Sequence, residues 1–208
     1  IKGYWGLVGG AQNLGSASTI NATGTNKVVQ ISAATLVAFP GYAENAVLKI
    51  IAIVTDKAGN ISTAGTDSDN EITIDTTQPT ISSITSTTPD GYAIPGDDIN
   101  VTVTFSEAVT LAGGNFRIVL ETGAADQTLS ISSISASATT IATYTVLENH
   151  ASLDLTATGI SLSAGTLRDA AGNAANLALP VGSNLANNSD IVVDGVIPTV
   201  VSVTSSDA

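Results

Sequence analysis

The stretch Ile99-Asn100-Val101-Thr102-Val103-Thr104-Phe105 decides the fold class, because its apolar and polar residues alternate with a period of two. Successive side chains of a β-strand point to opposite faces, so this alternation predicts a strand with one buried and one solvent-facing side. The β-branched threonines suit the outer face of a pleated sheet. We therefore predict a half-buried strand over 99–105.

The same period recurs along the chain. Apolar residues alternate over 116–120, Ile72 and Ile74 flank Thr73, and a short apolar run at 191–193 precedes Asp194. Turn-forming residues separate these runs at 89–91, 95–97, 113–115 and 172–173. No stretch carries apolar residues at helical spacing, and short helical turns are expected only within 107–113 and 148–155. The sequence therefore predicts an all-β fold.

The composition limits the classes of function. The 208 residues include 18 acidic and 6 basic side chains, and the formal net charge is -12. Such a chain lacks the clustered cations that bind phosphate, so we expect no nucleic-acid partner and no binding to anionic lipid. The absence of Cys excludes disulfides and Cys-ligated zinc, and the single histidine, His150, excludes a multi-histidine metal site. No apolar run is long enough to cross a membrane, so we expect no membrane insertion.

Catalysis is not expected either. His150 lies between strand-like segments and is interpreted as a surface loop residue. Glu107 follows a predicted strand and is expected only to bond a nearby loop. No Gly-x-Ser-x-Gly motif of a serine hydrolase is present. We predict that the chain is not an enzyme.

Two motifs recur in the same order. The turn Asp56-Lys57-Ala58-Gly59-Asn60 returns as Asp169-Ala170-Ala171-Gly172-Asn173. The linker Ile74-Asp75-Thr76-Thr77-Gln78-Pro79-Thr80-Ile81 returns as Val193-Asp194-Gly195-Val196-Ile197-Pro198-Thr199-Val200. A proline cannot donate to a strand ladder and suits the beginning of a new domain. The linkers are therefore interpreted as domain boundaries.

These boundaries predict three parts. Residues 1–75 are one sandwich domain, which is incomplete if it lacks a strand, and residues 76–194 are one complete domain. Residues 195–208 are the first strand of a following domain. We therefore expect the chain to be a segment of a longer protein or a processed product.

Residues 76–200 carry a set of motifs in a fixed order. These motifs are Asp90-Gly91-Tyr92, Gly96-Asp97, Phe105-Ser106-Glu107-Ala108-Val109, the turn at 169–173 and the linker that begins at Val193. Together they resemble the bacterial Ig-like repeats of very large secreted adhesins and cell-surface proteins. The resemblance implies tandem Greek-key β-sandwiches joined end to end on the bacterial cell surface, often with calcium at the junctions. The partners would then be neighbouring Ig-like repeats of the same chain.

The acidic residues near the linkers suit calcium, which takes oxygen ligands. Alternate loops of a sandwich meet at one end, so we expect the first turn and linker to converge with the loops of Asp90 and Asp97 around one ion. The second turn and linker offer corresponding oxygens. The predicted Ca²⁺ ligands are Asp56, Asn60, Asp75, Asp90, Asp97, Asp169, Asn173 and Asp194. Each of them also suits a plain turn, in which Asp or Asn bonds its own backbone.

The predicted function is that of an extracellular spacer, stiffened by calcium, that holds a binding region away from a bacterial cell. One alternative is a subunit of a self-assembling surface filament or surface layer, in which residues 195–208 add as a strand to another copy of the chain. The other is a carbohydrate- or surface-binding adhesion module, for which residues 1–44 are the only sufficiently irregular region.

Overall fold

The computed structural model describes residues 3–4, 32–38, 41–48, 53–54, 58–63 and 72–205. The chain divides into two compact units, Ile1–Thr77 and Gln78–Ala208, which are called unit 1 and unit 2 below. The division falls two residues beyond the boundary predicted after residue 75. The identity of the units as repeats stays a prediction.

Unit 1 contains short paired strands in its described part. β1 (Gly3–Tyr4) pairs with β3 (Ile53–Val54), and β2 (Val47–Leu48) pairs with β4 (Ile72–Thr73), both antiparallel. The helix α1 (Ala33–Val37) is five residues long. After β4, the buried Ile74 exchanges two backbone hydrogen bonds with residues 45 and 46, each 2.8 Å long. These bonds fix the chain just before Asp75.

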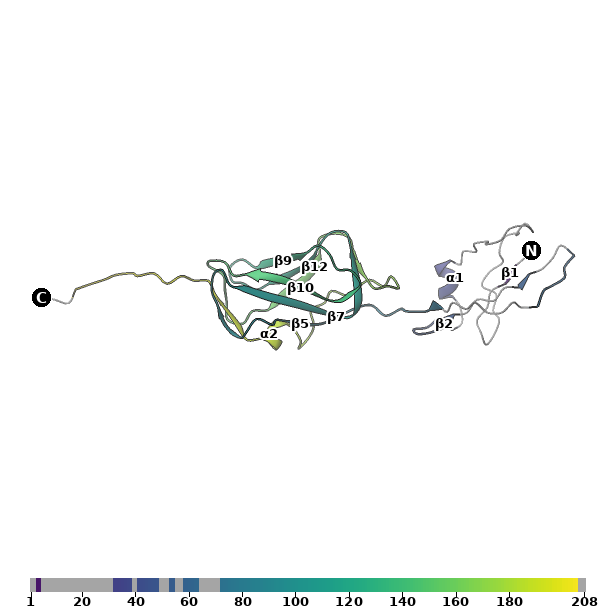
Figure 1. Cartoon of the computed structure of the whole chain (residues 1–208), viewed down its shortest axis with the longest axis horizontal. Helices are drawn as coiled ribbons and strands as arrows, with labels where there is room; N and C mark the ends of the chain where they lie inside the picture. Colours follow the sequence, from purple (N-terminus) through teal and green to yellow (C-terminus); the bar gives the residue numbers. More distant parts are fainter. Residues whose placement is uncertain are drawn as a thin grey trace. The chain divides into compact units, whose positions relative to one another are not determined.

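Unit 2 is built from three sheets (Figure 1). Its strands are β5 (Ile81–Thr85), β6 (Gly91–Ala93), β7 (Asp98–Ala112), β8 (Phe116–Leu120), β9 (Gln127–Ile131), β10 (Ser137–Thr145), β11 (Ala151–Ser152), β12 (Ala157–Leu162), β13 (Thr166–Arg168) and β14 (Ile191–Asp194). The long β7 pairs with β10 along one edge and with β5 and β13 along the other. β8 lies between β9 and β12, and β14 pairs with β11 and, in parallel, with β6. The predicted all-β class is confirmed.

One hydrophobic core joins the three sheets of unit 2. The predicted inward residues of the opening stretch are all buried, with Ile99, Val101 and Val103 at 0% exposure. Phe116, Ile118 and Leu120 of β8 are also at 0% exposure, and the ring of Phe116 meets that of Phe105 edge-on at 5.7 Å. The period-two pattern therefore identified the core face of both strands correctly.

Some local predictions are corrected by strand pairing. Most of 107–113 continues β7 instead of forming a helical turn, and two residues of 148–155 form β11. The short helix α2 (Leu185–Asn188) lies where no helix was predicted, because the Asn184 side chain caps it and Leu185 is buried. Residues 195–205 contain no strand, and the assignment of 195–208 to a following domain stays a prediction.

Candidate carboxylate site

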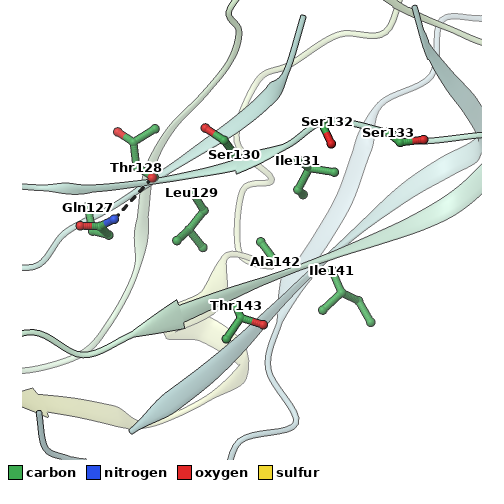
Figure 2. A pocket seen from close by; sticks show the side chains of 10 residues that line it. All are labelled: Gln127, Thr128, Leu129, Ser130, Ile131, Ser132, Ser133, Ile141, Ala142 and Thr143. Atoms are coloured by element: carbon green, nitrogen blue, oxygen red, sulfur yellow. Dashed lines mark hydrogen bonds between the residues drawn. The ribbon is translucent and has the colours of Figure 1, made fainter. Parts of the chain in front are cut away.

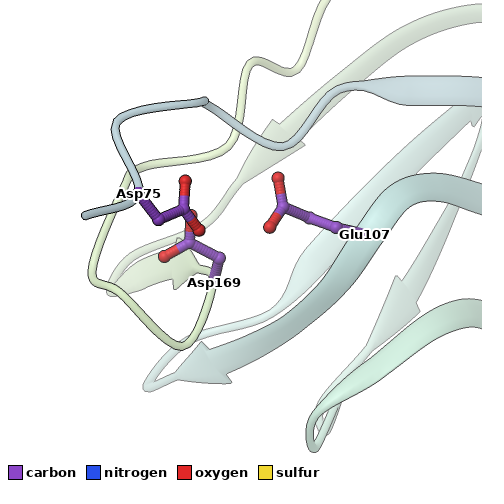
Figure 3. Close-up of side chains that lie close together, drawn as sticks. All are labelled: Asp75, Glu107 and Asp169. Atoms are coloured by element: carbon purple, nitrogen blue, oxygen red, sulfur yellow. The ribbon is translucent and has the colours of Figure 1, made fainter. Parts of the chain in front are cut away.

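Three carboxylates gather near the segment that leads into β5. The carboxylate oxygens of Asp75, Glu107 and Asp169 lie within 4.8 Å of one another. Glu107 belongs to β7, and Asp169 directly follows β13, which pairs antiparallel with the end of β7. Figure 3 shows the three acidic groups facing a common point. We call these residues the carboxylate triad.

Asp169 is held by its own turn. Its Oδ1 accepts hydrogen bonds from the backbone N–H groups of Gly172 (2.6 Å) and Asn173 (2.8 Å), and its Oδ2 accepts one from Nδ2 of Asn173 (2.9 Å). Burial alone would raise the pKa of Asp169, but these hydrogen bonds and one from Ala171 outweigh it and hold the pKa below its usual value. Asp169 therefore stays ionised at neutral pH.

Asp75 is half-buried, and its Oδ1 accepts a hydrogen bond from the backbone N–H of Thr77 at 3.0 Å. The next residue, Thr76, donates to the Glu44 carboxylate from both its backbone and its hydroxyl, at 2.6 and 2.8 Å. The second linker copy has the same local turn, since Oδ1 of Asp194 accepts from the backbone N–H of Val196 at 3.2 Å. Aspartate thus shapes the backbone at both linkers.

The two copies of the Ala-Gly-Asn turn also agree locally. Gly59 has φ of 93° and Gly172 has φ of 100°, a region that favours glycine because it has no Cβ. In the first copy Asn60 is exposed, whereas Asn173 in the second is half-buried beside Asp169. Asp56, another predicted ligand, lies outside the described residues.

Asp90 and Asp97 are not part of the triad. β7 begins at Asp98, and Glu107 lies nine residues further, roughly 30 Å along a strand. Oδ2 of Asp97 accepts from the backbone N–H of Ile94, and Oδ1 of Asp90 accepts from the backbone N–H of Asp190, both at 2.9 Å. The predicted convergence of these two aspartates with Asp75 is wrong, because β7 runs back along unit 2 between the two ends.

Asp194 lies at the same end of unit 2 as Asp97. The parallel pairing of β14 with β6 places Val193 opposite Ala93, and each strand then runs on to one of these aspartates. Asp194 is exposed and separate from Asp169 and Asn173, with which it was grouped as a second ion site. Within unit 2, the structure therefore places Asp169 and Asn173 at one end and Asp97 and Asp194 at the other.

Glu107 was missed as a site residue. Its neighbour Ser106 exchanges bonds with Thr80, since Ser106 N–H donates to the Thr80 carbonyl at 2.8 Å and the Ser106 hydroxyl accepts from Thr80 N–H at 2.9 Å. These bonds bring Glu107 beside the incoming segment. The signal available in the sequence was its place in the motif Phe105-Ser106-Glu107-Ala108-Val109.

The geometry of the triad suits a hard cation. Two oxygens that bind one calcium ion at about 2.4 Å can be at most about 4.8 Å apart, and the triad oxygens lie within this limit. Close carboxylates repel one another when all are ionised, and a dication would relieve that repulsion. The triad offers oxygen ligands alone, which are the ligands calcium prefers.

A groove lies beside β6, β11 and β14. It has a volume of about 730 Å³, and its lining includes Tyr92, Leu153, Glu121, Asp154 and Asp194. Tyr92 and Leu153 are 78% and 92% exposed, so the groove combines an open aromatic ring with carboxylates. The carbohydrate-binding alternative was assigned to residues 1–44, most of which lie outside the described residues. Within the described part, this groove is the feature nearest to that alternative.

Comparisons with known proteins identify no relative of this chain. The chain matches no protein-family model, no curated protein and no solved structure. Across the described residues, neither helix has the length and apolar character needed to span a bilayer.

Proposed function

We propose that the chain is an extracellular spacer of a bacterial surface protein, made of Ig-like β-sandwich units in series and stiffened by calcium. The observation that carries the proposal is the carboxylate triad, because Asp75 is a linker residue and its carboxylate lies close to those of Glu107 and Asp169. A cation held by all three would restrain the linker backbone at Asp75. The local agreement of both linker turns supports a repeated plan.

The composition agrees with this proposal. The chain has no Cys and no Met, the two side chains most easily oxidised outside the cell. Its net charge of -12 keeps the chain soluble but makes it repel itself, so a bound dication would stabilise it. Thr and Ser on the outward strand positions give a solvated surface.

Calcium titration tests the proposal. Thermal unfolding of the whole chain is measured in EDTA and in millimolar calcium, with magnesium at the same ionic strength as a control. We expect calcium to raise the midpoint by about 3–6 °C, because a ligand that binds only the folded state stabilises it by mass action. Magnesium should raise the midpoint less, since it demands a smaller octahedral site.

The matched variants locate the ion. Glu107→Gln keeps the size of the side chain, removes one triad charge and should abolish most of the calcium response. Asp126→Asn changes an exposed carboxylate outside the triad and should leave the response intact. Equal responses in Glu107→Gln and the parent chain would overturn the assignment of the ion to the triad.

A further inference from the structure

An open groove lies between β9 and β10, which belong to different sheets (Figure 2). It has a volume of about 540 Å³ and is lined by residues 127–133 and 141–143. Leu129 is 6% exposed on its floor, and Ile131 and Ala142 pack against the core. Ile141, at 62% exposure, stands on its rim. The groove therefore has an apolar floor open to solvent, and hydroxyl and amide side chains make up the rest of its lining. These side chains are Gln127, Thr128, Ser130, Ser132, Ser133 and Thr143.

Both strands that border the groove have an open edge in the described part of the chain. β9 pairs only with β8, and β10 pairs only with β7. The outer edge of a strand presents N–H and C=O groups on which a further strand can form. Each of the two edges therefore offers backbone groups to a further strand.

The groove is uncharged in a strongly acidic unit. No Asp, Glu, Lys or Arg occurs among its lining residues, whereas unit 2 has twelve acidic residues and two arginines. A basic ligand would find no carboxylate there, and an acidic one would be repelled by the unit as a whole. The groove therefore suits an extended, uncharged peptide whose backbone bonds to the strand edges and whose apolar side chains on one face meet the floor at Leu129.

The chain itself contains a peptide of this kind. Residues 196–204 carry no charge and contain no strand. Their large apolar side chains are between 58% and 94% exposed, and these are Val196, Ile197, Val200, Val201 and Val203. The related segment 77–85 has the same Pro-Thr-apolar order and forms β5 against β7. Residues 196–204 thus have a sequence type that becomes a strand where a sheet edge is offered.

We propose that residues 196–204 of one copy add as a strand in the β9–β10 groove of a second copy. The donor segment and the acceptor groove are different surfaces, so the contact is heterologous and repeats head to tail into a filament. Calcium at the triad plays no part in this contact, and the inference goes beyond the spacer function.

Two binding measurements test the contact. A labelled peptide with the sequence of residues 195–205 is titrated with the whole chain and followed by fluorescence anisotropy. We expect saturable binding that Ile141→Lys weakens by at least about tenfold, because the lysine charge would be buried against an apolar strand. Val181→Lys is the control, since Val181 is fully exposed and lies outside the groove. Binding that Ile141→Lys leaves unchanged would place the peptide elsewhere and overturn the proposal.

Sedimentation velocity tests the head-to-tail geometry. The parent chain should form larger species as its concentration rises, and Val201→Lys or Ile141→Lys should each remain monomeric. An equimolar mixture of these two variants should stop at a dimer, because only one intact donor and one intact acceptor can meet. A parent chain that stays monomeric into the millimolar range, or a mixture that grows beyond dimers, would overturn the proposal. Neither outcome bears on the calcium response, so the two proposals fail separately.

Discussion

At the residue scale, the hydrogen bonds to Asp169 predict how stability depends on pH. The folded pKa lies below the ordinary value of 3.8, so the stability that Asp169 provides is complete above pH 3.8 and is lost as pH falls through the folded pKa. Asp169→Asn should cost about 1–3 kcal/mol at neutral pH, because an amide cannot accept all three bonds.

Urea unfolding at neutral pH and at about pH 3 measures this effect, since the parent chain should approach the variant as Asp169 becomes protonated. Asp126→Asn again provides the control. A difference between the parent and Asp169→Asn that stays constant from neutral to acid pH would contradict the assignment.

The buried Tyr144 predicts an alkaline effect of opposite sign. Its hydroxyl is hydrogen-bonded to Nδ1 of His150 at 2.8 Å, and burial raises the pKa of Tyr144 from 10.0 to about 12. The stability it provides is complete below pH 10 and is lost as pH rises toward 12. Tyr144→Phe should cost about 1 kcal/mol at neutral pH, and this difference should shrink or reverse above pH 10. Urea unfolding across that range checks it, and a difference independent of pH would contradict it.

At the element scale, the loop after β10 encloses the end of β14. Gly195 N–H donates to the His150 carbonyl at 2.7 Å, and Asn149 N–H donates to the Gly195 carbonyl at 2.9 Å. A Cβ at Gly195 would lie 2.4 Å from the Leu147 carbonyl oxygen and 2.6 Å from that of His150. Only glycine fits there without a backbone shift.

Gly195→Ala should therefore destabilise the chain by about 1–3 kcal/mol through overpacking. Gly159→Ala is a matched control, because its Cβ would meet only Val119 side-chain atoms at 3.9 Å. Urea unfolding of both variants measures the contrast, and equal costs would show that the loop yields without strain.

The strands were predictable where one face is buried and the other is solvated. The alternation at 99–105 and 116–120 gave the core residues directly, because alternate residues of a strand face opposite sides of the sheet and only one side is buried. The continuation of β7 through Glu107 was not predictable, since residues 106–108 lack a buried apolar side chain. The parallel pairing of β6 with β14 depends on residues a hundred positions apart, and no local pattern encodes it.

At the scale of the whole molecule, unit 2 should fold without unit 1. Every buried member of its core lies between Ile81 and Val193, so excision at Gln78 removes none of them. In EDTA, a chain of residues 78–208 should unfold at the same urea concentration as unit 2 of the parent chain. Calcium should not raise this urea concentration, because the shorter chain lacks Asp75. A chain of residues 72–208 retains Asp75 and should respond to calcium. An unfolded 78–208 chain would contradict this prediction.

The candidate site was predictable in kind but not in membership. Asp75 and Asp169 were identified because acidic turns recur at the same places in a repeat. The triad includes Glu107 but not Asp90 or Asp97, because the path of β7 decides which loops lie at the same end of unit 2. Turn chemistry can be read locally, whereas the meeting of loops depends on strand order.

The parallel pair of β6 and β14 has a mechanical consequence. Tension applied to the chain at Gln78 and beyond Gly195 would pull β14 along its own axis, past the neighbouring β6. The hydrogen bonds between Ile191–Val193 and Gly91–Ala93 lie across that direction, so they would be loaded together in shear instead of opening one after another. Unit 2 would therefore unfold in a single abrupt step under force, and the β6–β14 hydrogen bonds would set the force at which it does so.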